Sequence, residues 1–395
     1  MDRRRHGSAS GRAQVSAPVV VIGGGVIGCA VAHELARHSV AATLVEARRE
    51  LAQGASGTNS GILHTGFDST PGELETELIL RSGELREQAF ASLGVPRVRC
   101  GAHMRPRDDE GRAAALRLHE NARSLGVKCV MEQDGSLRIP GESVTDPVAY
   151  TYALAGAALA GGTELRLGTP VVGLEEHGEQ VLVALGGDGA GERVRASAVI
   201  NCAGLFADEV ALMAGEQPFS VHPRKGEFLV YEQPRDEPLE EILLPVPSAM
   251  GKGVLVFPTI DGRHLIAGPT ARERTDKDDW SVEDDARELI ATRARAMFAG
   301  LAHAREVSAY AGLRTTGVDG VNYAIAHSST IAALVHVGAI RSTGLSASLG
   351  IAEHVMNMLR DRDLVAPRGG RWLAPSVAPR AAEDWWRRAA RRSGQ

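Results

Sequence analysis

Hydrophobic positions along the chain form short β-branched runs and longer helical patterns, and their order at the start predicts an α/β opening. Residues 19–22 read VVVI, as expected of a strand buried on both faces of a parallel sheet. Apolar residues at helical spacing follow from Ala30 to Ala36, and residues 41–47, AATLVEA, predict a second short strand. A strand, a helix and a second strand in this order predict a βαβ unit.

Later segments alternate between helical and strand-like patterns. Helical periodicity covers residues 73–95, 111–126 and 146–162. Residues 163–187 alternate apolar and polar positions between glycines, which predicts antiparallel strands joined by glycine turns. The runs at 226–232, 253–260 and 263–269 are rich in apolar residues and predict the floor of a second sheet.

Three glycines between the first strand and its helix give the opening a specific chemistry. Gly23, Gly25 and Gly28 are in G-x-G-x-x-G register, and Glu46 ends the second strand. The first glycine permits a tight turn, the second lets the backbone approach a pyrophosphate, and the third lets the helix pack on the strand. Amides at the helix N-terminus then face the phosphates, and Glu46 can accept hydrogen bonds from ribose hydroxyls. We predict a dinucleotide site. The acid at the strand end argues against NADP, and the motif alone does not separate NAD from FAD.

Composition excludes several other classes of protein. The chain has 44 Lys and Arg against 49 Asp and Glu, and this balance gives no whole-chain signal for nucleic acid or an anionic membrane. Its four cysteines are scattered without a C-x-x-C pair, which argues against a metal or iron–sulfur site and fits a reducing cytoplasm. No stretch is long and apolar enough to predict a transmembrane helix.

The segment after Glu46 favours FAD. Residues 55–68, ASGTNSGILHTGFD, surround His64 with glycine and small polar residues, where an NAD enzyme would continue into another strand–helix unit. Here the chain resembles the D-amino-acid-oxidase-like superfamily of FAD-dependent oxidoreductases, first its soluble glycerol-3-phosphate oxidases and dehydrogenases and next its L-2-hydroxyglutarate oxidases. Further similar segments extend the resemblance over about residues 18–362, at 169–175, 196–211, 222–232, 251–271, 311–317 and 340–355.

The resemblance implies an α/β fold, with α+β character in the second domain. It predicts a Rossmann-like FAD-binding domain of the glutathione-reductase type and a discontinuous, antiparallel-sheet substrate domain. We expect the FAD-binding domain to comprise residues 18–95, 145–217 and 329–362, and the substrate domain to comprise residues 96–144 and 218–328.

The two ends of the chain are expected to lie outside both domains. We predict a disordered leader over residues 1–17 and a C-terminal tail over residues 363–395. The basic stretch EDWWRRAARR at 383–392 is expected to be solvated or docked, with contact to a membrane surface or a partner as the alternative.

The glycine motif and the matching segments together define the predicted FAD-binding residues. They are Gly23, Gly25, Ile27, Gly28, Glu46, Ala47, Thr58, Asn59, Ser60, Val172, Ala203, Gly204, Gly312, Gly344, Leu345, Ser346 and Ala347. The strand at Val172 is expected to meet the adenine through its backbone. The helix N-terminus after Gly344 is expected to stabilise negative charge at the pyrimidine edge of the flavin, with simple serine capping as the alternative.

Three residues are predicted to carry the chemistry. The resemblance places His64 beside the flavin, where it would act as a base or orient the substrate, or else only hydrogen-bond the loop or the flavin. Arg314 would bind an anionic group of the substrate, with a surface salt bridge as the alternative. Lys252 would face the substrate, or be an ordinary exposed lysine. Lys225, Arg224 and Arg341 are weaker candidates.

These residues predict an oxidoreductase that transfers a hydride from a small anionic 2-hydroxy compound, glycerol 3-phosphate or a related phosphorylated alcohol, to flavin N5. The alternatives are an L-2-hydroxy acid oxidase, an amino acid or amine oxidase, a biosynthetic tailoring oxidase, and a flavoprotein without a substrate of its own. The expected electron acceptor is O2 or a quinone. The expected location is the cytoplasm, with peripheral membrane contact as an option, and no nucleic-acid partner or metal is expected.

Overall fold

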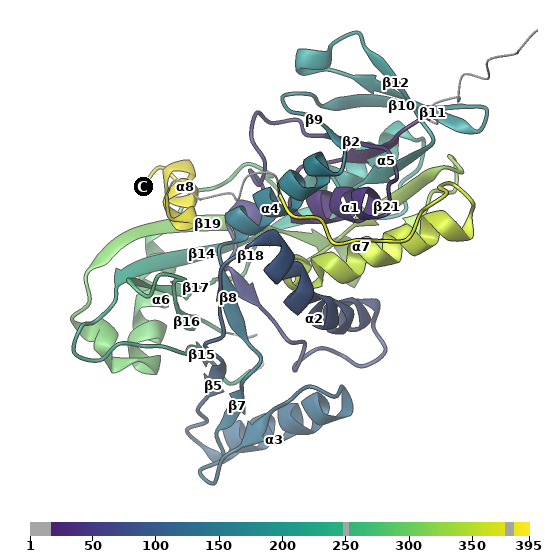
Figure 1. Ribbon diagram of the computed structural model, residues 1–395. Coiled ribbons are helices and arrows are strands. Elements are labelled where there is room, and N and C mark those ends of the chain that lie inside the picture. The colour runs from purple at the N-terminus through teal and green to yellow at the C-terminus, as the bar shows by residue number, and fades with distance from the viewer. Residues whose placement is uncertain (1–16, 248–252, 376–382) are drawn as a thin grey trace, which may run out of the picture.

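Two sheet-based domains make up the molecule (Figure 1). The computed structural model describes residues 17–247, 253–375 and 383–395. The first domain is built on a six-stranded sheet, with the spatial order β20 (Ala324–His327), β21 (Leu334–Gly338), β13 (Ala198–Asn201), β1 (Val19–Ile22), β2 (Ala42–Val45) and β9 (Glu164–Arg166). Neighbouring strands are parallel except β20, which is antiparallel to β21.

The six-stranded sheet is covered on both faces. On one face, α1 (Val26–Arg37) packs against α4 (Pro147–Ala160) and α7 (Gly344–Asp361), and α7 packs against α2 (Leu74–Leu93). On the other face lies an antiparallel sheet of β10 (Val171–His177), β11 (Gln180–Leu185) and β12 (Arg193–Ala196), with α5 (Ala207–Met213) beside it. Alternate residues of β1 join the two cores, because successive side chains of a strand point to opposite faces. The apolar run VVVI is therefore buried throughout.

The second domain is built on a larger, mostly antiparallel sheet. In spatial order its strands are β18 (Arg272–Glu273), β14 (Val221–Glu232), β17 (His264–Gly268), β16 (Leu255–Pro258), β15 (Ile242–Leu244), β5 (Ala102–Met104), β7 (Leu137–Ile139) and β6 (Val130–Met131), and β19 (Glu306–Gly317) pairs with β14. The long strands β14 and β19 run antiparallel over almost their whole length. Helix α6 (Asp284–Met297) packs on β14 and β17, and α3 (Asp109–Ser124) packs on β6 and β7.

Short elements join the two domains. A small antiparallel sheet contains β3 (Ile62–Leu63), β8 (Ser143–Thr145) and β4 (Arg97–Val98). The 3-10 helices are η1 (Ala55–Gly57), η2 (Gly187–Gly189), η3 (Gly204–Phe206), η4 (Ala299–Ala302) and η5 (Val318–Gly320).

Two sequence-based expectations for strands were wrong. Strand β9 pairs in parallel with β2, although the alternation over 163–187 predicted an antiparallel strand there. Strand β20 belongs to the six-stranded sheet, although the predicted boundary at 328 placed it in the substrate domain. Both strands are short, and alternation of side chains is the same in parallel and antiparallel strands. The pattern therefore did not identify their partners.

The end of the chain forms a docked helix. Helix α8 (Trp385–Arg392) lies beside β19 (Figure 1), and its two tryptophans are 4% and 2% exposed. They pack into the same hydrophobic cluster as Phe228 and Tyr310 of the second domain, and the Tyr310 ring lies edge-on to Trp385 with ring centroids 5.4 Å apart. Of the alternatives given for the basic stretch of the C-terminal tail, docking is the one that the structure shows for α8. The leader over residues 1–17 falls almost wholly outside the described residues.

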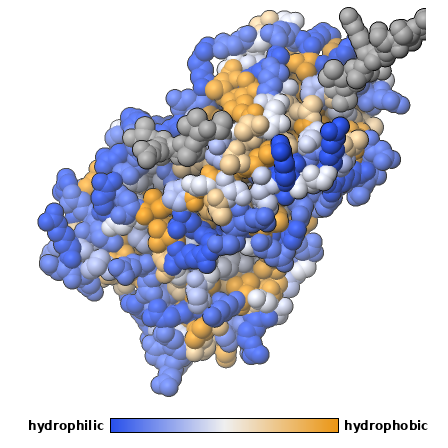
Figure 2. Space-filling view, viewed as in Figure 1, coloured by the Kyte–Doolittle hydropathy of each residue, from blue (hydrophilic) through white to orange (hydrophobic). Residues whose placement is uncertain are grey.

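Hydrophilic residues cover most of the visible face, with smaller apolar patches between them (Figure 2). Within the described ranges, none of the helices combines the length and the apolar character needed to cross a membrane.

Candidate active site

The turn between β1 and α1 has the geometry of a nucleotide-binding turn. Gly23 has φ +108°, a conformation that favours glycine, and its amide donates to the Val45 carbonyl at 2.8 Å. A Cβ on Gly28 would lie 1.9 Å from the Gly23 carbonyl oxygen, so this glycine permits the helix to pack on the turn. The Glu46 carboxylate accepts the Gly24 amide at 2.6 Å and lines the adjoining cavity.

A cavity of about 830 Å³ extends from this turn to the start of α7. Twelve of the predicted cofactor-binding residues line it together: Gly23, Gly25, Ile27, Glu46, Thr58, Asn59, Ser60, Ala203, Gly204, Gly312, Gly344 and Leu345. The first turn of α1 faces it, and such a turn has amides without helical partners that suit phosphate oxygens. The residues present therefore fit a dinucleotide: α1 would hold its pyrophosphate and Glu46 would hold a ribose.

Five predicted cofactor-binding residues are not among those that line the cavity. Gly28 packs against the turn, Ala47 is exposed after the second strand, and Ser346 and Ala347 are buried in the first turn of α7. Val172 has a side chain that is 56% exposed, on the sheet that covers the opposite face. Their roles at the cofactor stay predictions.

His64 follows β3 and lies at the cavity wall. Its side chain is 27% exposed, and its Nδ1 lies 2.9 Å from a carboxylate oxygen of Glu142, which is completely buried. The His64 amide donates to Ser346 Oγ at 2.8 Å, which joins the segment of β3 to the first turn of α7. The ring is thus held from behind while its edge faces the cavity.

Arg86 of α2 supports the backbone of this corner. Its Nη2 donates to the carbonyls of His64 at 3.3 Å and Ser346 at 3.1 Å, and the residue is 5% exposed. Burial lowers the pKa of Arg86 from its usual value. Neither Glu142 nor Arg86 was found from the sequence, because both lie outside any motif, in a turn and on an ordinary amphipathic helix.

Two arginines face each other on the floor of the cavity. Arg314 of β19 is directly opposite Arg224 of β14, and both line the cavity. Burial and the neighbouring Arg224 lower the pKa of Arg314 to about 10. Arg224 pairs with Glu273 at 3.1 Å, whereas Arg314 donates to the Thr270 carbonyl and forms no ion pair with a carboxylate of the described residues. A half-buried cation beside a like charge provides a place for an anion.

Small residues make room for this arrangement. A Cβ on Gly226 would lie 2.3 Å from Arg314 Nη2, so the glycine on β14 leaves space for the guanidinium. A Cβ on Gly312 would lie 2.2 Å from the Thr58 carbonyl oxygen, so β19 approaches the segment of the predicted flavin site backbone to backbone.

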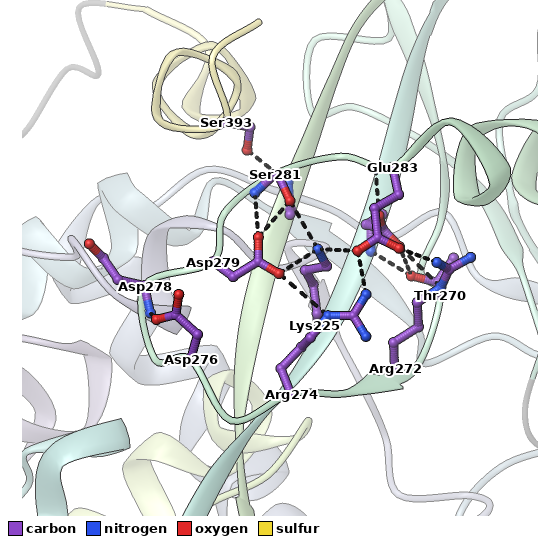
Figure 3. Close-up of polar contacts among 12 residues, drawn as sticks. Lys225, Thr270, Arg272, Arg274, Asp276, Asp278, Asp279, Ser281, Glu283 and Ser393 are labelled. Carbon is purple, nitrogen blue, oxygen red and sulfur yellow. Dashed lines mark hydrogen bonds and ion pairs between the residues drawn. The ribbon is translucent and has the colours of Figure 1, made fainter.

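Neither of the two lysines predicted for the site is seen at the cavity among the described residues. Lys252 lies outside the described residues, and its role stays a prediction. Lys225 is fully buried away from the cavity, where its Nζ contacts Asp279 at 2.8 Å and Glu283 at 3.0 Å (Figure 3). This contact fixes the segment 276–283, whose Trp280 lines the cavity. Lys225 is therefore a structural residue rather than a substrate ligand.

Arg341 and Thr343 lie at the cavity wall near α7. Both contact the largely buried carboxylate of Glu75, Arg341 at 3.1 Å and Thr343 at 2.6 Å. The Arg341 side chain is 47% exposed, so its charge is paired with Glu75 and is also hydrated by solvent. The contacts with Glu75 fix the segment before α7, so Arg341 does not add a second cation without a carboxylate partner.

Fold, glycine turn and cavity together define a dinucleotide-binding protein, and comparison with known proteins shows that its class is that of the FAD-dependent oxidoreductases. The model of the family described as "FAD dependent oxidoreductase" (DAO) matches residues 18–358, so the chain belongs to this family and FAD is its cofactor.

Individual relatives can be named. The chain is 27% identical to a glycerol 3-phosphate dehydrogenase of Caloramator mitchellensis over 359 residues, 87% of this chain and 74% of the relative. It is 27% identical to a glycerol 3-phosphate oxidase of Mycoplasma pneumoniae, with 86% and 94% covered. An L-2-hydroxyglutarate dehydrogenase of Escherichia coli K12 is 28% identical over 67% of each chain. Among solved structures, the dithionite-reduced L-alpha-glycerophosphate oxidase of Mycoplasma pneumoniae with FAD bound superposes with a TM-score of 0.81, at 25% identity, covering 91% of this chain and 97% of that one.

Proposed function

We propose that the protein oxidises the secondary hydroxyl of a small anionic 2-hydroxy compound, with glycerol 3-phosphate or a related phosphorylated alcohol as the first candidate. The observation that carries the proposal is Arg314, a half-buried guanidinium without a carboxylate partner among the described residues, in the cavity that His64 also lines. Relatives that are glycerol 3-phosphate oxidases and dehydrogenases support the same class of substrate.

Each residue of the cavity has a specific task in this proposal. Arg314 binds the phosphate or carboxylate through charge-assisted hydrogen bonds, and Arg224 opposite adds positive potential. His64 takes the proton of the substrate hydroxyl on the ring nitrogen that is not bonded to Glu142. When bound, FAD supplies the acceptor for the hydride that leaves the carbon bearing this hydroxyl. The apolar walls at Phe228 and Phe257 exclude water from this end of the cavity.

An L-2-hydroxy acid is the second candidate substrate. The planar guanidinium of Arg314 suits a carboxylate as well as a phosphate, and an L-2-hydroxyglutarate dehydrogenase is among the relatives. The return of electrons to O2 or to a quinone stays a prediction, as do the cytoplasmic location and the absence of a nucleic-acid partner.

Anaerobic titration of the holoprotein tests the proposal. Glycerol 3-phosphate, L-2-hydroxyglutarate and an amino acid are added separately, and the loss of oxidised-flavin absorbance is followed. We expect glycerol 3-phosphate to bleach the flavin at the lowest concentration. Preferential bleaching by L-2-hydroxyglutarate would instead support the second candidate, and no bleaching by any of the three would contradict the proposed class of reaction.

Arg314→Met tests the assignment of the anion site. Loss of a charge-assisted hydrogen bond costs roughly 2–3 kcal/mol, so the substrate concentration for half-maximal flavin reduction should rise about 30- to 160-fold. Arg263→Met is the control, because the Arg263 side chain is 70% exposed and pairs with Asp261 away from the cavity. An unchanged concentration dependence in Arg314→Met would remove Arg314 from the site.

A further inference from the structure

Glu142 lies in the turn between β7 and β8, and it has a carboxylate with no exposure to solvent. One oxygen, Oε2, contacts His64 Nδ1 at 2.9 Å. The other, Oε1, accepts the Thr65 amide at 2.7 Å and the Thr65 hydroxyl at 2.8 Å. The carboxylate thus contacts two consecutive residues, and its contact with His64 is made through the ring.

A carboxylate that leaves water loses several kcal/mol of solvation unless hydrogen bonds and opposite charge replace it. Thr65 provides two neutral donors. The nearby groups that can carry positive charge are the His64 imidazole, in direct contact, and the Arg86 guanidinium, which interacts with Glu142 electrostatically. The fold can therefore tolerate the buried Glu142 carboxylate mainly when His64 donates a hydrogen bond to it from Nδ1.

Other charged groups also face this corner. Asp68 follows the same segment, and Glu75 comes from α2. Arg341 lies before α7, and Arg224 and Arg314 come from β14 and β19. These groups line the same cavity, whereas Glu142 lies behind the ring and is hydrogen-bonded to it.

We infer that Glu142 is a positioning residue for His64, an inference that rests on the proposed function. Glu142 holds the proton on Nδ1, so the neutral ring presents Nε2 as the acceptor for the substrate hydroxyl. When the hydroxyl O–H bond breaks, the proton forms an N–H bond at Nε2. The electron pair of the O–H bond completes the carbonyl as the hydride leaves the carbon for the flavin. The imidazolium that results faces a carboxylate already in place.

Glu142→Gln tests this inference, because it keeps the size of the side chain and removes the charge. We expect kcat to fall about 10- to 100-fold, the range typical for loss of a carboxylate that orients a metal-bound histidine, while KM stays within about twofold because Glu142 does not contact the substrate. A carboxylate favours the protonated ring. Its loss should therefore move the acidic limb of the kcat/KM profile to lower pH.

Thr65→Val is the matched control. It removes one hydrogen bond to the same carboxylate and leaves the charge beside His64. We expect kcat within about threefold of the wild type and an acidic limb at the wild-type pH. A shift of equal size in Thr65→Val and Glu142→Gln would mean that packing of the turn, and not the charge, matters, and it would overturn the inference.

A measurement without substrate separates this inference from the proposed function. The wild-type holoprotein is labelled with ¹³C-histidine, and the His64 signal is assigned by its loss in His64→Asn. We expect its titration midpoint to lie above the ordinary histidine value of about 6.5, and to fall in Glu142→Gln. If no substrate reduces the flavin, this midpoint still tests the pair. A wild-type midpoint below about 6.5 overturns the inference, even if Glu142→Gln fails to fold.

Discussion

Gly28 is the residue at which α1 comes nearest to the turn before it. Because a Cβ there would lie 1.9 Å from the Gly23 carbonyl oxygen, Gly28→Ala must displace backbone rather than a flexible side chain. We expect the variant to lose roughly 1–3 kcal/mol of stability, the cost of overpacking, and most of its bound FAD. The measurement is the ratio of flavin to protein after purification.

Gly54→Ala provides the comparison for this prediction. Gly54 lines the cavity, and a Cβ added there meets no atom within 4 Å. This variant should retain FAD at the wild-type ratio. A full complement of FAD in Gly28→Ala would show that the turn can relax and that the third glycine is not required.

Residue-level prediction from the sequence was possible only where a residue lies in a motif. His64 and Arg314 were expected at one site, and the structure places both on the wall of one cavity, although their roles are still predictions. Glu142 carries no such signal, because a glutamate in a polar turn reads as solvated until the fold buries it. Lys225 was a weaker candidate for the site, but the structure buries it away from the cavity. A lysine beside an arginine on a strand gives no sign that acidic residues more than fifty positions later surround it.

At the scale of elements, Glu216 joins the end of α5 to the loop after β20. Burial alone would raise the pKa of Glu216, but hydrogen bonds from Ser328, Ser329 and His336 outweigh it and lower the pKa to about 2. A carboxyl whose pKa is lower in the folded state than in the unfolded state stabilises the fold at pH values above its unfolded pKa, which is about 4.3. This contribution disappears as the pH falls toward 2.

Glu216→Gln should therefore lose about 2 kcal/mol at pH 7, the typical value of hydrogen bonds to a charged group. Its stability should also depend less on pH than the wild type below about pH 4.3. Urea unfolding at several pH values measures both effects. Glu237→Gln is the control, because that side chain is exposed. Parallel losses of stability in acid for the wild type and Glu216→Gln would contradict the prediction.

Helix α8 contributes to the hydrophobic core of the second domain even though it is only eight residues long. Trp386 is 2% exposed in the cluster of Phe228 and Tyr310, so Trp386→Ala should lower the free energy of unfolding by about 3–5 kcal/mol. Arg391→Ala in the same helix should change it by less than about 1 kcal/mol, because an exposed ion pair contributes little. Thermal unfolding of the two holoproteins checks the difference, and equal melting temperatures would show that α8 is not part of the folding unit.

On the scale of the whole molecule, the order of elements predicted more than their lengths did. The glycine turn and the matching segments along the chain led to the α/β first domain and the sheet-rich second domain, which the comparisons confirm. Strands β9 and β20 were placed wrongly because their partners are chosen by distant segments, and a pattern of three or four residues contains no information about them. The cavity itself was predictable only through the resemblance, since its walls come from both domains.

The position of β1 in the middle of its sheet also bears on biosynthesis. β1 is the first strand of the described chain, yet its neighbour β13 begins at Ala198 and the next strand, β21, begins at Leu334. A ribosome therefore releases β1 and its neighbour β2 long before β13, the strand on the other side of β1, exists. Until then the nascent chain exposes a run of four β-branched residues that only late synthesis, which includes α7, can bury completely.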